Sequence, residues 1–220
     1  MLKVGLTGGI ASGKSLVGEM FVALGAHLIE ADKISHALMQ PGQAVYQQVV
    51  QHFGREILNA DGTVNRSKLA ELAFGASSTN SKSQNRPSRI DELNRIVHPA
   101  VIRAQEEWMD EVARQNKDKD PQAVAIVEAA LLIEAGAADH FDKLIVVTCS
   151  EEQREARFAK RQKIDLDAAR QEVARRMSAQ LPDAEKVKRA DFVIDNSGSI
   201  DATRAQVVRA WEQLRDGAQS

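Results

Sequence analysis

The chain has 220 residues, 43% of them hydrophobic, which is enough to bury the core of one domain spanning 1–220. Its 29 lysines and arginines against 31 aspartates and glutamates give a net charge of -2, which excludes a general basic field for holding nucleic acid or an anionic membrane. The single cysteine, Cys149, excludes an internal disulfide, and the N-terminus shows no signal-peptide pattern. These features predict a cytoplasmic protein with no nucleic-acid, membrane or obligate protein partner.

Five short apolar runs predict the strands of a sheet. The first, at 2–7, leads into a glycine-rich segment and then a helix over 14–24, which Gly25 is predicted to end. The other runs lie at 26–30, 124–129, 143–149 and 191–196. Helical patterns between such runs are typical of a parallel sheet covered on both faces. The sequence therefore predicts a three-layer α/β fold with a five-stranded parallel sheet.

Two long connections interrupt this alternation. Residues 33–115 are mostly helical in pattern and predict an inserted helical subdomain, in which the Ser- and Asn-rich stretch 75–88 is expected to form a mobile loop. A highly charged pair of helices is expected over 151–185. The most apolar segment, 123–138, carries two glutamates and falls short of the ~20 residues of a membrane span, so it predicts a buried strand followed by a helix.

The segment GGIASGKS, read from Gly8, satisfies G-x-x-x-x-G-K-[ST] and lies between a predicted strand and a predicted helix. Glycine at Gly8 and Gly13 allows successive backbone N–H groups to turn toward a phosphate, and the helix N-terminus adds its partial positive charge. Lys14 is expected to reach the β- and γ-phosphates, and the Ser15 hydroxyl to bind Mg²⁺. The segment predicts an ATP-binding site made of Gly8, Gly9, Ile10, Ala11, Ser12, Gly13, Lys14, Ser15 and Leu16.

A GTP-dependent switch is disfavoured by the rest of the chain. The nearest approach to the guanine-reading element Asn-Lys-x-Asp is Asn116-Lys117-Asp118-Lys119, whose fourth residue is wrong. Asp195-Asn196-Ser197-Gly198 matches a switch pattern, but it lies on the last predicted strand instead of soon after the phosphate loop.

Asp32 directly follows the second predicted strand. The carboxyl ends of parallel strands face the ligand crevice of an open α/β sheet, so this carboxylate is predicted near the γ-phosphate. A kinase needs such a group to orient an acceptor hydroxyl and take its proton. The alternative is that Asp32 only caps the next helix.

Arginines recur through the charged region. Arg154, Arg157 and Arg161 fall on one face of a predicted helix, and Arg175 and Arg176 lie on the next. Together they could form a lid that neutralises charge on the transferred group and excludes water. The alternative is a solvated face whose arginines pair with nearby glutamates.

Several short segments, in their order and spacing, resemble the dephospho-coenzyme A kinase family, of the P-loop nucleoside monophosphate kinase-like group. They cover nearly the whole chain and read LTGGIASGKS, EAD at 30–32, PG at 41–42, HFG at 52–54, DGTVNRSKL at 61–69, LNRIVHP at 93–99, LLIE at 131–134 and ADFVIDNSGS at 190–199. The resemblance implies ATP-dependent phosphorylation of the ribose 3′-hydroxyl of dephospho-coenzyme A, the last step of coenzyme A synthesis, with Mg²⁺ as metal. It also implies that the helical insertion holds the substrate.

The resemblance implies a role for several further residues. Asp32 would be the catalytic carboxylate, acting with Lys14, and Arg66 and His98 would bind the substrate. The lid would carry Arg157, Arg161, Arg176 and Gln180, the first two catalytic, and Asn196 would lie near adenine. For His98 the alternative is a buried structural histidine. Glu128, at a strand end, is expected either to support Mg²⁺ through water or to pair inside the substrate cleft.

Two rival functions stay open at this point. One is another small-molecule kinase of the same architecture, acting on a nucleotide or a sugar acid. The other is a regulatory nucleotide-binding protein that hydrolyses its nucleotide slowly and needs no acceptor. A nucleic-acid-dependent ATPase is weaker, because only 4% of the residues are aromatic and the net charge is acidic.

Overall fold

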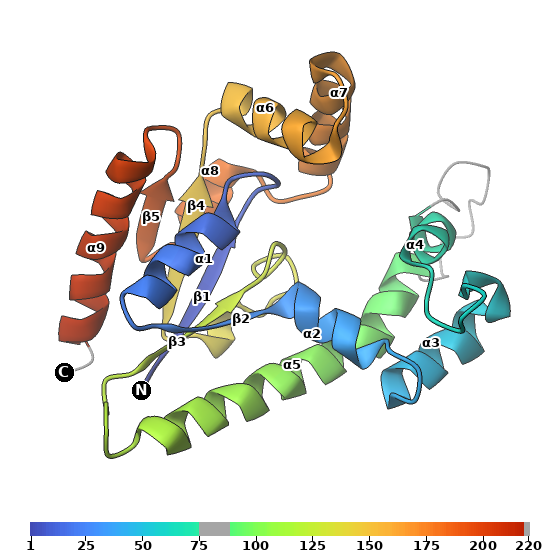
Figure 1. Ribbon diagram of the computed structural model, residues 1–220, viewed down its shortest axis with the longest axis horizontal. Helices are drawn as coiled ribbons and strands as arrows, with labels where there is room; N and C mark the ends of the chain where they lie inside the picture. Colours follow the sequence, from blue (N-terminus) through green and yellow to red (C-terminus); the bar gives the residue numbers. More distant parts are fainter. Residues whose placement is uncertain (75–88, 218–220) are drawn as a thin grey trace. The chain divides into compact units, whose positions relative to one another are not determined.

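A computed structural model of the protein describes residues 1–74 and 89–217 (Figure 1). The stretch 75–88, expected to be a mobile loop, lies outside the described residues. Five strands form one sheet, and they run over β1 (Leu2–Gly8), β2 (His27–Glu30), β3 (Val124–Glu128), β4 (Lys143–Thr148) and β5 (Phe192–Asp195). Each lies where an apolar run predicted it.

All the strand pairs are parallel, in the order β2-β3-β1-β4-β5. β1 lies at the centre, where Leu6 pairs with Glu128 of β3 and with Ile145 of β4. All the residues of β3 are buried, as expected for a central parallel strand covered on both faces. The predicted five-stranded parallel sheet is confirmed.

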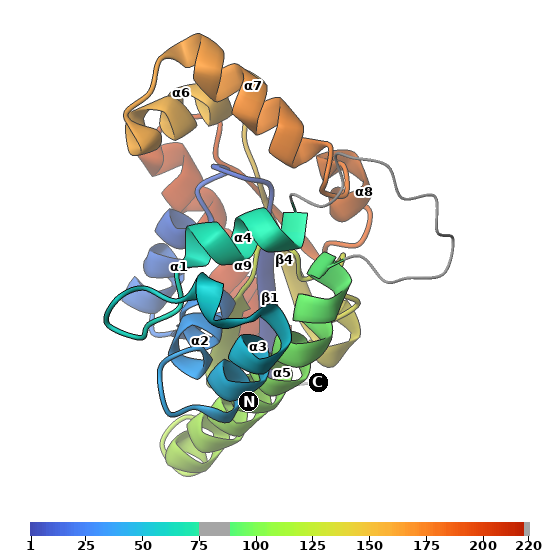
Figure 2. The same cartoon turned by 90° about the vertical axis from the view of Figure 1, so that its right-hand side faces the viewer.

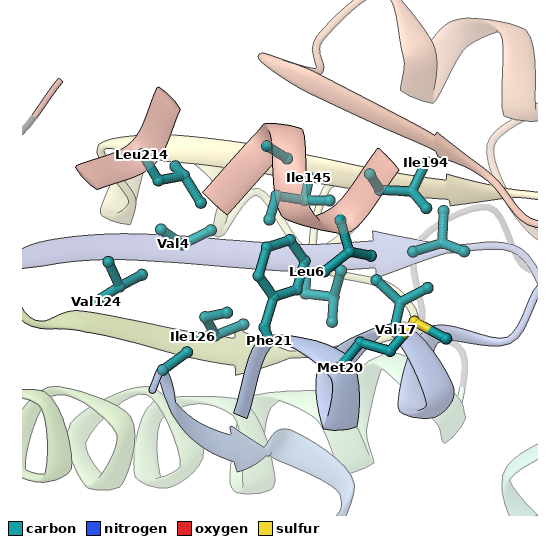
Figure 3. Close-up of a cluster of buried hydrophobic side chains, with 14 residues drawn as sticks. Val4, Leu6, Val17, Met20, Phe21, Val124, Ile126, Ile145, Ile194 and Leu214 are labelled. Atoms are coloured by element: carbon teal, nitrogen blue, oxygen red, sulfur yellow. The ribbon is translucent and has the colours of Figure 1, made fainter. Parts of the chain in front are cut away.

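The main core lies between the sheet and two helices, α1 (Lys14–Ala23) and α9 (Ile200–Gly217). Phe21 of α1 is fully buried against the inward side chains of the strands, Val4, Leu6, Val124, Ile126, Ile145, Val147 and Ile194 among them (Figure 3). Period-two alternation sends Leu144 and Val146 of β4 to the opposite face. That face is covered by the turn over 129–141 and by α8 (Asp183–Val187).

The prediction of a helix directly after β3 is wrong. Residues 130–136 form turns, followed by a short 3₁₀ helix, η3 (Ala138–His140). Gly136 has φ +70, its N–H donates to the Ile133 carbonyl, and the Ala137 N–H donates to the Leu132 carbonyl. This is the hydrogen-bond pattern that ends a helix, so only one turn forms before the chain reverses. Gly25, at φ +108, ends α1 with the same pattern, as predicted.

The described chain divides into two compact units. The first contains residues 1–30 and the chain from Met109 onward, and the second is Ala31–Trp108. The sheet, α1, α8 and α9 belong to the first unit, together with α6 (Glu151–Gln162) and α7 (Leu166–Met177), which lie side by side (Figure 2). No helix of the described residues is long and apolar enough to cross a membrane.

The second unit is helical and has a small core of its own. It contains α2 (Ala31–Leu38), α3 (Ala44–Phe53), the 3₁₀ helix η1 (Arg55–Ile57), α4 (Arg66–Phe74) and the first part of α5 (Arg89–Asn116). Val49, Phe53 and Ile57 are each at most 2% exposed. An isolated antiparallel bridge between Leu58 and Val64 holds the loop that leads into α4.

Candidate active site

The glycine-rich loop joins the end of β1 to the start of α1, as the sequence predicts. Gly13, directly before α1, has φ +94, a conformation that L side chains rarely adopt. A β-carbon at Gly13 would lie 2.1 Å from Asn196 Nδ2, and one at Gly9 would lie 2.2 Å from Arg154 Nη1. Glycine at these positions therefore lets polar side chains approach the loop backbone closely.

Five consecutive carbonyl oxygens of this loop accept hydrogen bonds from side chains. Lys14 Nζ donates to Gly8 (3.2 Å) and Gly9 (3.3 Å), Arg154 Nη1 to Ile10 (2.7 Å), the Cys149 thiol to Ala11 (3.8 Å), and Asn196 Nδ2 (2.9 Å) and Arg157 Nη1 (3.3 Å) to Ser12. Burial raises the pKa of the Cys149 thiol, in keeping with its part as a donor. Since the C=O and N–H of one peptide unit point in opposite directions, the amides of these peptide units face away from the side-chain donors, and the Ser12 N–H donates to the Gly9 carbonyl at 3.3 Å.

Ser15 presents its hydroxyl at the start of α1. This residue is exposed, and its Oγ donates to Glu128 Oε1 at 3.0 Å. Glu128 ends β3, the strand beside β1, and is 8% exposed. A hydroxyl and a carboxylate in contact are the hard oxygen ligands that Mg²⁺ prefers, so this donor set fits the metal.

Arg154, in α6, is buried and has a structural role. It is 3% exposed, and besides the Ile10 carbonyl it bonds Asp183 of α8, with 2.5 Å between Nη2 and Oδ2. One guanidinium thus ties α6 and α8 to the phosphate loop. The sequence indicated a row of arginines, but it carried no signal that this member would be buried or that Asp183 would be its partner.

Arg157 lies one turn further along α6 and also contacts the loop. Its Nη1 donates to the Ser12 carbonyl at 3.3 Å, and its Nη2 donates to the Asn196 carbonyl at 2.8 Å. The structure therefore brings together three residues that the sequence only indicated separately: Ser12, Arg157 and Asn196.

The other arginines predicted for the lid lie around a buried aromatic ring. The guanidinium carbons of Arg161 and Arg176 lie 5.6 and 5.3 Å from the centre of the Phe158 ring, within cation–π range. Arg176 Nε also donates to Glu172 Oε1 at 2.6 Å, and Arg175 binds the same carboxylate. Hydrogen bonds from Arg175 and Arg176 lower the pKa of Glu172 to about 2.

Gln180, the last predicted lid residue, follows α7. It is half-buried, and its backbone N–H donates to the Met177 carbonyl at 3.0 Å.

The predicted acceptor-side residues all lie in the second unit. Asp32 is exposed in the first turn of α2, one residue past the helix start and so not at the N-cap position. Arg66 begins α4 and lines a pocket of about 260 Å³ together with His36, Met39, Gln40, Asn59, Thr63 and Val64. His98 is half-buried within α5, and burial lowers its pKa.

A model of the dephospho-CoA kinase family matches residues 2–202. The chain belongs to this family. It is 38% identical over 214 residues to the dephospho-CoA kinase of Aquifex aeolicus, covering 97% of this chain and 98% of that protein. It is 40% identical over 220 residues to the dephospho-CoA kinase of Syntrophotalea carbinolica, covering 99% and 94%.

Solved structures agree with this assignment. TT1252 from Thermus thermophilus superposes with a TM-score of 0.74 at 27% identity, over 96% of each chain. A dephospho-CoA kinase from Campylobacter jejuni superposes with a TM-score of 0.65 at 25% identity, over 98% of each chain. The three-layer α/β kinase fold predicted from the sequence is confirmed, and the chain is an enzyme of a family that phosphorylates dephospho-CoA to coenzyme A in the last step of coenzyme A biosynthesis.

Proposed function

We propose that this chain transfers the γ-phosphoryl group of ATP to the ribose 3′-hydroxyl of dephospho-CoA, giving coenzyme A and ADP. The observation that carries the proposal is the phosphate loop, whose carbonyl oxygens from Gly8 to Ser12 all accept side-chain donors. Membership of the family supplies the identity of the acceptor. Both cosubstrates are small molecules, and we propose the cytoplasm as the compartment, where a lone cysteine stays reduced.

On the donor side, the loop amides and Lys14 bind the phosphates of ATP in this proposal. Lys14 is half-buried, and its Nζ donates to the Gly8 and Gly9 carbonyls. A bound phosphate would replace these carbonyls as the acceptor. The Ser15 hydroxyl would hold Mg²⁺ directly, and the Glu128 carboxylate, 3.0 Å from that hydroxyl, would support the ion through water. Bound there, Mg²⁺ would neutralise charge on the phosphates.

On the acceptor side, Asp32 would accept a hydrogen bond from the 3′-hydroxyl, align it for in-line attack and receive its proton. Its exposed carboxylate lies two residues beyond β2 and makes no helix cap. The Arg66 guanidinium lines a polar pocket suited to an anionic part of the substrate. His98 would contribute as a neutral group, because burial lowers its pKa.

The lid would complete the site. Arg157 already lies against the loop, and Arg161 and Arg176 carry exposed positive charge at its outer side, with Gln180 close by in sequence. Guanidinium groups that meet the transferred phosphoryl would stabilise its charge and exclude water as a competing acceptor.

The test is ADP release from MgATP with and without dephospho-CoA, for the wild type and for Asp32→Asn. We expect release to depend on dephospho-CoA, and Asp32→Asn to lower kcat about 100-fold or more while the KM for MgATP changes little. ADP release that needs no acceptor would favour a regulatory nucleotide-binding protein. An unchanged kcat in Asp32→Asn would remove this residue from the chemistry.

A further inference from the structure

Asn196, in the loop after β5, is 2% exposed and has both side-chain polar atoms engaged. Its Nδ2 donates to the Ser12 carbonyl at 2.9 Å, and its Oδ1 accepts from Thr203 Oγ1 at 3.0 Å. Thr203 lies in the first turns of α9 and is fully buried. The Asn196 side chain is thus bonded to protein groups at both ends.

The backbone of Asn196 is held as well. Its N–H donates to the Thr148 carbonyl at 2.8 Å, and its own carbonyl accepts from Arg157 Nη2 at 2.8 Å. β4, β5, α6 and α9 therefore all contribute to placing this one residue against the phosphate loop.

The chemistry of the partners fixes which way the amide faces. The Ser12 carbonyl can only accept, so the Asn196 NH₂ group must face it and the Oδ1 atom must face away. A buried Oδ1 then needs a donor, and the Thr203 hydroxyl supplies one. Thr203 Oγ1 also lies 3.2 Å from the Ser199 carbonyl, so its one proton has a second acceptor, slightly further away than Asn196 Oδ1.

We propose that Thr203 and Asn196 are a positioning pair that fixes the phosphate loop at Gly13 and thereby sets the affinity for ATP without either side chain touching it. The inference rests on the proposed function, because it concerns the ATP site of that reaction. Asn196 packs where a β-carbon on Gly13 would be, and it holds the Ser12 carbonyl outward. Without the hydrogen bond from Asn196 to the Ser12 carbonyl, the loop can leave the conformation that binds ATP. The apparent affinity for ATP then falls with the fraction of molecules that keep this conformation.

The experiment compares Thr203→Val, which removes the hydroxyl but keeps the shape, with the control Thr203→Ser, which keeps the hydroxyl. We expect Thr203→Val to raise the KM for MgATP and the Kd for MgADP about tenfold, because a buried acceptor loses its donor. The kcat and the KM for dephospho-CoA should change less than about twofold, and Thr203→Ser should stay within about twofold of wild type throughout. Equal effects of Val and Ser would overturn the proposal.

A double-mutant cycle with Asn196→Ala separates positioning from simple support of α9. If Thr203 acts through Asn196, Thr203→Val has little further effect on the KM for MgATP in the Asn196→Ala background. Additive effects would contradict the pairing. Asn196→Ala alone must raise the same KM at least as much as Thr203→Val, which keeps the test decisive if Thr203→Val folds poorly. Wild-type turnover in the same assay tests the proposed function separately.

Discussion

The arginines of α6 and α7 differ in what they contact. Arg154 and Arg157, on the loop side, donate to the backbone carbonyls of Ile10 and Ser12, and Arg154 is 3% exposed. Arg161 and Arg176, on the outer side, lie over Phe158 with exposed side chains. The inner pair contacts the phosphate loop, whereas the outer pair contacts Phe158, and Arg176 also pairs with Glu172.

Arginines three and four residues apart on one helix can thus serve two purposes. Helical spacing puts Arg154, Arg157 and Arg161 on one face of α6, but the loop reaches only the first two. Loss of Arg154, which is buried and paired with Asp183, should therefore appear mainly in stability, and loss of an outer arginine mainly in turnover. The predictions below test this division.

Lys14 also donates to loop carbonyls, as Arg154 and Arg157 do. Its substitution therefore tests whether a cation with such contacts always has a structural role. We expect Lys14→Ala to lower kcat about 1,000-fold, because a charge aimed at the transferred phosphoryl group is lost. Its free energy of unfolding should change by less than about 1 kcal/mol, since the side chain is only half-buried. Steady-state kinetics and urea unfolding measure the two effects, and near-normal turnover would contradict the assignment of the loop.

Arg154→Met should show the opposite pattern. Removal of the guanidinium leaves Asp183 and the Ile10 carbonyl without their partner, at a cost of about 3 kcal/mol in the free energy of unfolding. The control is Arg204→Met, whose exposed ion pair with Asp201 should contribute less than about 1 kcal/mol. Equal losses in the two variants, measured by urea unfolding, would show that Arg154 is no anchor.

The double variant Arg161→Gln/Arg176→Gln addresses the outer pair. We expect kcat to fall about 100-fold, because charge on the transferred group loses its stabilisation. The free energy of unfolding should change by about 1 kcal/mol or less, since these side chains are exposed. Unchanged kcat together with a large loss of stability would assign both arginines to the fold.

The smallest change in stability is expected for substitution of Glu172. Its pKa is lowered from 4.5 to about 2 by Arg175 and Arg176, so its contribution to stability is fully present above about pH 4.5 and is lost as the pH falls through about 2. Solvent screening limits that contribution to about 1 kcal/mol. The difference in unfolding free energy between wild type and Glu172→Gln should therefore shrink from pH 5 to pH 2. The control is Glu185→Gln, which loses an exposed ion pair with Lys188. If the difference in unfolding free energy between wild type and Glu172→Gln did not depend on pH, the pairing of Glu172 with the two arginines would be contradicted.

The sequence was sufficient to predict the sheet and the phosphate loop. Buried parallel strands need continuous apolar runs, and the loop needs fixed glycines, a lysine and a hydroxyl, so both are visible in local patterns. The helix after β3 was predicted wrongly because Gly136, which ends it after one turn, was not recognised as a helix-terminating residue.

The contacts around the loop could not be predicted in the same way. Arg154 meets Asp183, and Thr203 meets Asn196, only after strands and helices distant in sequence have packed together. No local pattern distinguishes a buried Thr203 from an exposed one. Lys186 is a similar case: it is fully buried, 2.9 Å from Glu134, although it lies in a charged stretch of the sequence.

Transfer of a phosphoryl group from ATP to the 3′-hydroxyl of dephospho-CoA places the new phosphate at one defined position of the product. Phosphorus NMR of the product formed from MgATP and dephospho-CoA distinguishes a ribose 3′-phosphate from a 2′-phosphate and from inorganic phosphate. We expect a single 3′-phosphomonoester, formed in equal amount to ADP. Inorganic phosphate as the only new signal, or a phosphate on another hydroxyl, would contradict it.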